Sequence, residues 1–171
     1  MKKPSVEMIA NVAIILLCIL VGTVFVKNSF FKPDRAAQQK QNMVGKTISL
    51  DGMDPHAANV TVLLALSSAC KFCDASTAFY QQLTTLRQKP GAQFQTVGVF
   101  REPVDTAREY LTRKGLSLDS VISHPLSDLG VDGTPTLFVI NPNGKIIYAS
   151  VGLLDDAKQK EVLHMLGTSS T

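Results

Sequence analysis

The sequence predicts an α/β protein with a mixed central sheet flanked by helices, preceded by one N-terminal transmembrane helix. Strand-length apolar runs alternate with amphipathic stretches from residue 60 to residue 114, as in parallel strands joined by crossover helices. The turn signal Asn-Pro-Asn-Gly at 141–144 separates the last two apolar runs, which predicts an antiparallel hairpin at the sheet edge. Residues 8–26 carry no charge and approach the ~20 residues that cross a bilayer as a helix.

The first half of the folded region contains two predicted strands and one predicted helix. Residues 47–50 alternate apolar and polar side chains, which predicts a short first strand closed by a turn at 51–52. Residues 60–66 are almost all apolar, so we expect a central strand covered on both faces. The stretch 74–87 is expected to be a helix. Its predicted apolar face consists of Ala75, Ala78, Phe79, Leu83 and Leu86.

The second half predicts three more strands and two more helices. Residues 94–100 read as a second buried strand. Residues 104–114 read as a helix, with an acid in the first turn, basic residues in the last turn and a glycine after it. Residues 136–140 and 145–149 are the two strands of the hairpin, and residues 155–166 form a final amphipathic helix.

The N-terminal apolar stretch is interpreted as an uncleaved anchor. The competing interpretation is a cleaved signal peptide, but such peptides have a shorter apolar core, and Val24-Phe25-Val26-Lys27 offers no small-residue cleavage site. We therefore expect three parts: a membrane anchor at 1–27, a polar tether at 28–43 and a folded domain at 44–171.

The orientation of the anchor is argued from its flanks. Lys2 and Lys3 precede the apolar stretch, as in an N-terminus held in the cytoplasm and in an export signal. Five basic residues follow the stretch and, by charge counting, would favour the opposite orientation, but a domain of this length is translocated largely regardless of nearby charge. We therefore expect a single-pass protein of the cell inner membrane, with its domain facing the periplasm or another extracytoplasmic side.

The overall charge excludes some classes of partner. The formal net charge is +3, and no basic stripe with interleaved aromatic residues is present, so nothing indicates a nucleic-acid partner. There is also no Gly-x-Gly-x-x-Gly and no phosphate-binding loop, so no nucleotide or flavin cofactor is expected.

The motif Cys70-Lys71-Phe72-Cys73 constrains the chemistry most strongly. It follows the apolar run 60–66 and opens the predicted helix, so Cys70 lies at a helix N-terminus, where the helix dipole favours a thiolate. Cys70 would then attack a disulfide, and Cys73, one turn deeper, would resolve the mixed disulfide.

Metal binding is the alternative interpretation of the same cysteines. A zinc site would need two further ligands at comparable spacing, and the histidines are scattered singly. A Cu(I) carrier could combine both thiols with His124, since soft thiolates suit Cu(I). The third cysteine, Cys18, lies in the apolar stretch and is expected to be a small apolar residue.

The second informative motif is Gly133-Thr134-Pro135, directly before the predicted strand 136–140. An X-Pro bond there is a candidate for a cis peptide that turns the backbone towards the cysteine loop. Thr134 would then offer its backbone N–H and C=O to an extended substrate segment, with Pro135 shaping the site.

Taken together, these motifs resemble the membrane-anchored thioredoxin-fold proteins of the TlpA/ResA type, within the wider redoxin group. The resemblance runs from about residue 44 to residue 166. It implies a thioredoxin-like fold, Cys70 as the nucleophile, Cys73 as the resolving cysteine and a cis bond at Pro135. The implied activity is thiol–disulfide exchange on exported proteins, with a redox partner protein and with cytochrome c assembly as one setting.

The chain departs from the thioredoxin pattern at two positions. Ala69 stands where a tryptophan usually precedes the first cysteine, and Leu64 stands where many members carry a buried acid. Glu102 and Asp74 are the candidates for replacing that acid. A peroxiredoxin-like peroxidase is the enzymatic alternative: Ser67 could take the role of that group's threonine, but Leu63 replaces its usual proline.

Overall fold

The computed structural model describes residues 11, 14–23 and 42–167. The chain divides into two compact units, Met1–Arg35 and Ala36–Thr171. In the first unit, residues 14–23 are helical. No helix in these described ranges is long and apolar enough to span a membrane. Residues 8–10, 12–13 and 24–26 of the predicted anchor and residues 28–41 of the predicted tether lie outside the described residues, so both remain predictions.

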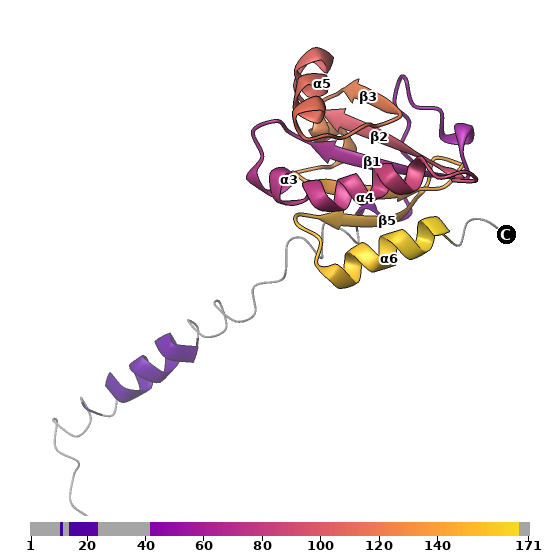
Figure 1. The fold of residues 1–171 in the computed structure, drawn as a ribbon. Coiled ribbons are helices and arrows are strands. Elements are labelled where there is room, and N and C mark those ends of the chain that lie inside the picture. The colour runs from indigo at the N-terminus through magenta and orange to yellow at the C-terminus, as the bar shows by residue number, and fades with distance from the viewer. Residues whose placement is uncertain (1–10, 12–13, 24–41, 168–171) are drawn as a thin grey trace, which may run out of the picture. The chain divides into compact units, whose positions relative to one another are not determined.

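The second unit contains a five-stranded mixed sheet with the strand order β3-β2-β1-β4-β5 (Figure 1). β1 pairs in parallel with β2, which pairs in parallel with β3. On the other side, β4 is antiparallel to both β1 and β5. The prediction of parallel strands followed by an antiparallel edge is therefore confirmed. The strands are β1 Val60–Leu66, β2 Phe94–Phe100, β3 Ser120–Ser123, β4 Thr136–Ile140 and β5 Ile146–Val151.

Both faces of the sheet are covered, as the apolar run of β1 predicts. All seven residues of β1 are buried. Alternate side chains of β1 point to opposite faces, so Val62 and Leu64 belong to one apolar cluster and Leu63 to another. The first cluster receives side chains from α4 Thr77–Arg87, α5 Val104–Arg113 and α6 Asp156–Gly167. The second is closed by buried side chains between Met43 and Met53 and by the 3₁₀ helix η2, Leu126–Leu129.

The helix predicted at 74–87 is two helices. α3, Lys71–Ala75, begins directly after Cys70, and α4 begins at Thr77. Ser76 separates them, because its hydroxyl donates to Phe72 O at 2.9 Å, a back-bond that bends helices. The bend changes the predicted apolar face: Ala75 and Ala78 are exposed, and Tyr80 is buried instead.

The strand predicted at 47–50 is wrong, and one strand was not predicted. Residues 47–50 form only an isolated bridge, between Thr47 and Lys145, because the sheet edge that they approach is a hairpin turn. β3 was missed because it is short and only partly buried, with Ser120 and Ser123 at its ends. The other predicted strands and helices are confirmed within one or two residues at each end.

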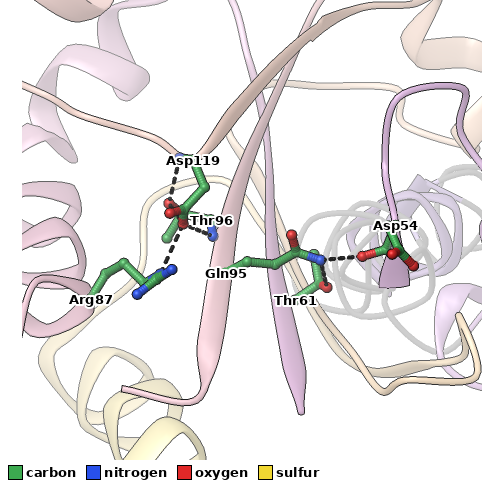
Figure 2. A network of polar contacts seen from close by, with 6 residues as sticks. All are labelled: Asp54, Thr61, Arg87, Gln95, Thr96 and Asp119. Atoms are coloured by element: carbon green, nitrogen blue, oxygen red, sulfur yellow. Dashed lines mark hydrogen bonds and ion pairs between the residues drawn. The ribbon is translucent and has the colours of Figure 1, made fainter. Parts of the chain in front are cut away.

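Polar contacts tie the first halves of β1 and β2 to each other and to neighbouring segments (Figure 2). Asp119 Oδ2 accepts hydrogen bonds from Thr96 N at 2.7 Å and Thr96 Oγ1 at 2.8 Å. The same oxygen accepts from Arg87 Nε at 3.1 Å, which ties the end of α4 to β2. Beside it, Gln95 Nε2 donates to Thr61 Oγ1 at 2.8 Å and so links β2 to β1.

Replacing Asp119 with alanine should destabilise the fold. Thr96 is fully buried, so its N–H and its hydroxyl hydrogen would lose their acceptor, at a cost of about 1–3 kcal/mol. Arg87→Ala is the control: it removes only a partly exposed ion pair and should cost at most about 1 kcal/mol. Equilibrium urea unfolding of the two variants measures both effects. Equal losses would contradict the assignment of the stabilisation to Thr96.

Candidate active site

The β1–α3 loop delivers both cysteines to the carboxyl end of the central strand. Cys70 is the N-cap of α3, and its Sγ accepts a hydrogen bond from Cys73 N at 3.1 Å. The Cys70 thiol also donates to Thr134 O at 3.2 Å. Both cysteines are free thiols; Cys70 is partly exposed and Cys73 is buried. The structure therefore brings together Cys70, Cys73 and Thr134, which are far apart in the sequence.

Cys70 is the more easily ionised of the two thiols. Burial works to raise its pKa, but hydrogen bonds from Cys73, Thr134 and Phe72 outweigh it, so the pKa of Cys70 lies below the ordinary thiol value. Several of these donors are backbone or side-chain groups at the first turn of α3, where the sequence predicted a stabilised thiolate. The partly exposed sulfur is thus the better nucleophile.

Cys73 has the opposite character. Burial is the largest influence on it and, with the neighbouring Cys70 sulfur, raises the pKa of Cys73 to about 12. Tyr80 and Tyr110 are each 1% exposed. Burial is the main cause that raises the pKa of both, and a charge on Cys73 raises both further. Cys73 is therefore a protonated thiol at neutral pH, and it must lose its proton before it can attack a disulfide.

The Thr134–Pro135 peptide bond is cis, as expected from the sequence. Pro135 is buried, and its carbonyl oxygen already accepts a hydrogen bond from Gly152 N at 2.7 Å. Thr134 is partly exposed and faces Cys70 through its carbonyl oxygen. Of the two residues predicted to bind substrate, Thr134 presents a backbone group to the site, whereas Pro135 lies beneath it.

Glu102 reaches the cysteine loop from the end of β2. Its Oε1 accepts hydrogen bonds from Ser67 Oγ at 2.7 Å, Ser68 N at 2.9 Å and Ser68 Oγ at 3.0 Å. Burial works to raise its pKa, but these hydrogen bonds outweigh burial, and the pKa of Glu102 lies below its ordinary value. The parallel register explains why Glu102 lies beside the cysteine loop. It pairs Leu66 with Phe100, so the loops that follow β1 and β2 lie side by side.

Asp74, the other candidate for the missing acid, is engaged elsewhere. Its Oδ1 lies 2.8 Å from Lys114 Nζ and accepts from Tyr110 Oη at 3.2 Å. The hydrogen bond from Lys114 is the main reason that the pKa of Asp74 lies below its ordinary value. Its side chain is 47% exposed. Asp74 therefore stabilises the contact between α3 and α5 and is already neutralised by a cation.

The positions of Ser67 and His124 give little support to the two alternative functions, a peroxiredoxin-like peroxidase and a copper carrier. The Ser67 hydroxyl, which a peroxidase of the peroxiredoxin type would direct at Cys70, donates to Glu102 instead. His124, the third ligand considered for copper, follows β3, and its Nε2 lies 3.8 Å from Asp128. Within residues 11, 14–23 and 42–167, no group of three or more His, Cys, Asp or Glu side chains is arranged to hold a metal ion.

Comparison with known proteins agrees with this geometry. No model of a protein family matches the chain. It is 32% identical over 95 residues to the thiol-disulfide oxidoreductase ResA of Geobacillus thermodenitrificans, a match that covers 53% of this chain and 54% of ResA. The chain thus spans about half the length of that curated relative.

Solved structures establish the fold. A chain from Chlorobium tepidum assigned as the thiol:disulfide interchange protein DsbE has a TM-score of 0.58 and 23% identity, over 75% of this chain and 92% of that one. StoA from Bacillus subtilis has a TM-score of 0.51 and 20% identity, over 69% of this chain and 92% of StoA. The resemblance read from the motifs is thereby confirmed: the chain has a thioredoxin-like fold and is similar to the TlpA/ResA type of thiol–disulfide oxidoreductase.

Proposed function

We propose that this protein catalyses thiol–disulfide exchange on other proteins through the Cys70/Cys73 couple. The observation that carries the proposal is the asymmetry of the two sulfurs. Cys70 is partly exposed, has a lowered pKa, and accepts a hydrogen bond from the Cys73 amide through its sulfur. Cys73 is buried and protonated. An attacking thiol needs access and ionisation, and a resolving thiol needs protection from solvent until the mixed disulfide has formed.

The exchange proceeds in two balanced steps. The Cys70 thiolate attacks one sulfur of a substrate disulfide, forms a mixed disulfide and releases the other substrate sulfur as a thiolate. Cys73 then gives its proton to solvent and attacks Cys70 Sγ, which forms the Cys70–Cys73 disulfide, breaks the mixed disulfide and releases the second substrate thiolate. A redox partner protein returns the couple to the dithiol. Run in reverse, the same steps oxidise a substrate dithiol.

Thr134 is the group that we assign to substrate binding. In the thiol form its carbonyl oxygen is occupied by the Cys70 S–H. When Cys70 ionises, that donor is lost, and the oxygen can accept an N–H from an extended substrate segment. Phe72, 63% exposed between the cysteines, offers an apolar surface beside the reacting sulfur. Pro135 is buried and contributes by shaping the loop.

We also propose that residues 8–26 anchor the protein in the cell inner membrane, with the catalytic domain on the periplasmic or extracytoplasmic side. Residues 14–21, which form more than two turns of the described helix, are all apolar, so this part of the helix is apolar all round. A helix of that kind in a small protein suits a membrane rather than a soluble core. Exported proteins, including those of cytochrome c assembly, would then be the accessible substrates.

Selective alkylation tests the assignment of the two sulfurs. At about pH 7.5, iodoacetamide should modify Cys70 and leave Cys73 unmodified, because only a thiolate reacts quickly. Since the pKa of Cys73 is about 12, its modification should appear only in strongly alkaline solution. Mass spectrometry of the peptides measures both reactions. Faster modification of Cys73 would contradict the assigned roles.

Trapping in cells tests the reaction itself. Cys73→Ala leaves Cys70 able to attack but removes resolution, so exported proteins should accumulate as mixed disulfides on Cys70. Cys70→Ser is the matched control and should trap nothing, and it should also abolish reduction of insulin. An empty trap, or rapid consumption of hydrogen peroxide with a sulfenic acid on Cys70, would refute the exchange reaction.

Membrane placement is tested by fractionation and protease digestion. The full chain should sediment with the inner membrane and resist carbonate extraction. Protease added to spheroplasts should digest its domain, whereas a cytoplasmic marker should survive. Protection of the domain in intact spheroplasts would contradict the proposed orientation.

A further inference from the structure

We propose that Glu102 is a positioning residue for the attacking cysteine: its carboxylate fixes the turn 67–70, and that turn fixes where the Cys70 sulfur lies. The inference rests on the proposed exchange reaction. It adds to that reaction a side chain that makes no described hydrogen bond to either sulfur and acts through the backbone of the cysteine loop.

Residues 67–70 form a tight turn that ends on the nucleophile. The Cys70 N–H donates to Ser67 O at 3.2 Å, the hydrogen bond that closes a four-residue turn. On its other side, Cys70 O accepts from Asp74 N at 3.1 Å, in the first turn of α3. The backbone of Cys70 is therefore held by the turn on its amino side and by the helix on its carboxyl side.

Glu102 fastens this turn from the neighbouring loop. Its Oε1 accepts from Ser67 Oγ at 2.7 Å, Ser68 N at 2.9 Å and Ser68 Oγ at 3.0 Å. The Ser67 hydroxyl oxygen itself accepts from Ala69 N at 3.4 Å. Hydrogen bonds to an ionised acceptor are about twice as strong as neutral ones. The three backbone N–H groups of residues 68–70 thus point to Glu102 or to Ser67, which Glu102 holds.

The Cys70 sulfur needs this anchor because it makes two directional contacts. Its Sγ accepts from Cys73 N at 3.1 Å and donates to Thr134 O at 3.2 Å. Thr134 belongs to the loop before β4, so the second contact requires Cys70 to keep its place relative to the sheet. The helix α3 is only five residues long, whereas Glu102 follows the buried strand β2 and ties the turn to it.

The charge of Glu102 and its anchoring role have opposite effects on Cys70. An anion nearby disfavours a thiolate, so removal of the charge alone would lower the pKa of Cys70. Removal of the anchor lets the turn shift and weakens the hydrogen bond from Cys73 N, which raises the pKa of Cys70. The two roles therefore predict changes of opposite sign.

The pH profile of Cys70 alkylation in the full chain tests the sign. Reduced protein is treated with iodoacetamide from about pH 6 to about pH 10, and mass spectrometry of the Cys70 peptide gives the rate. We expect Glu102→Ala to react about three- to tenfold more slowly than the parent at about pH 7, because its ionised fraction is smaller. At about pH 10 it should react at least as fast, because a thiolate of higher pKa is more nucleophilic.

Glu102→Gln separates the acceptor from the charge. It keeps an acceptor oxygen for Ser67 and Ser68, so its rate should stay within about threefold of the parent across the profile. A Glu102→Gln variant as slow as the alanine variant would overturn the positioning role.

Asp119→Ala is the matched control for a general loss of stability. It also removes a carboxylate that accepts from a backbone N–H and a hydroxyl, but near the start of β2. Both alanine variants should lower the free energy of unfolding, and only Glu102→Ala should change the Cys70 profile. Equal slowing of Cys70 in Asp119→Ala would overturn the inference.

Ser67→Ala is the second variant, which decides the question if Glu102→Ala fails to fold. It removes the shortest contact to Glu102 and the acceptor of Ala69 N. It should show the same pH-dependent loss at a smaller size, about two- to threefold at about pH 7. In either variant, an unchanged profile, faster alkylation at about pH 7, or slowing that persists at about pH 10 would overturn the positioning role.

The exchange reaction is judged separately, with an aromatic disulfide whose thiolate is coloured. The Cys70 thiolate attacks one sulfur, forms a mixed disulfide and releases one coloured thiolate. Glu102→Ala should slow this release at about pH 7 in the same proportion as alkylation. A parent protein that is alkylated at Cys70 but releases no coloured thiolate refutes exchange, while the alkylation profiles still decide whether Glu102 holds the sulfur.

Discussion

The hydrogen bond from the Cys73 amide to Cys70 Sγ is the interaction on which the site depends. It exists because β1 ends in a short loop that places Cys70 at the N-cap of α3, so that the backbone donor three residues later faces the sulfur. The same geometry fixes the burial of Cys73, one helical turn further in. A single local feature of the chain therefore makes one sulfur accessible and ionisable, and leaves the other protected and protonated.

The sheet turns this local feature into a site. β1 is central, so the loop that follows it is flanked on one side by the loop after β2 and on the other by the loop before β4. The β4 side brings the Thr134 carbonyl to Cys70, and the β2 side brings the Glu102 carboxylate to Ser67 and Ser68. The contacts of Asp119 and Gln95 involve residues near the start of β1 and β2, whereas the cysteines follow the end of β1, so that network lies away from the site.

Much of this arrangement can be read from the sequence, because its signals are local. The apolar runs of β1 and β2, the hairpin turn and the glycine after α5 each specify an element without reference to the rest of the chain. The bend at Ser76 and the edge strand β3 could not be read in the same way. The bend depends on the hydrogen bond that the Ser76 hydroxyl donates to the backbone carbonyl of Phe72, one turn earlier. β3 has too little apolar pattern of its own and is ordered by pairing with β2.

The positions of the two acids considered as replacements for the missing one show most clearly what the sequence leaves open. Proximity along the chain favours Asp74, next to Cys73, yet that carboxylate is drawn away by Lys114 and Tyr110. Glu102 lies 32 residues after Cys70 in the chain, and only the parallel register of β1 with β2 sets it beside the cysteine loop. From there it bonds the turn and not the sulfurs. Glu102 therefore supports the loop that precedes Cys70 through the backbone and side chains of Ser67 and Ser68.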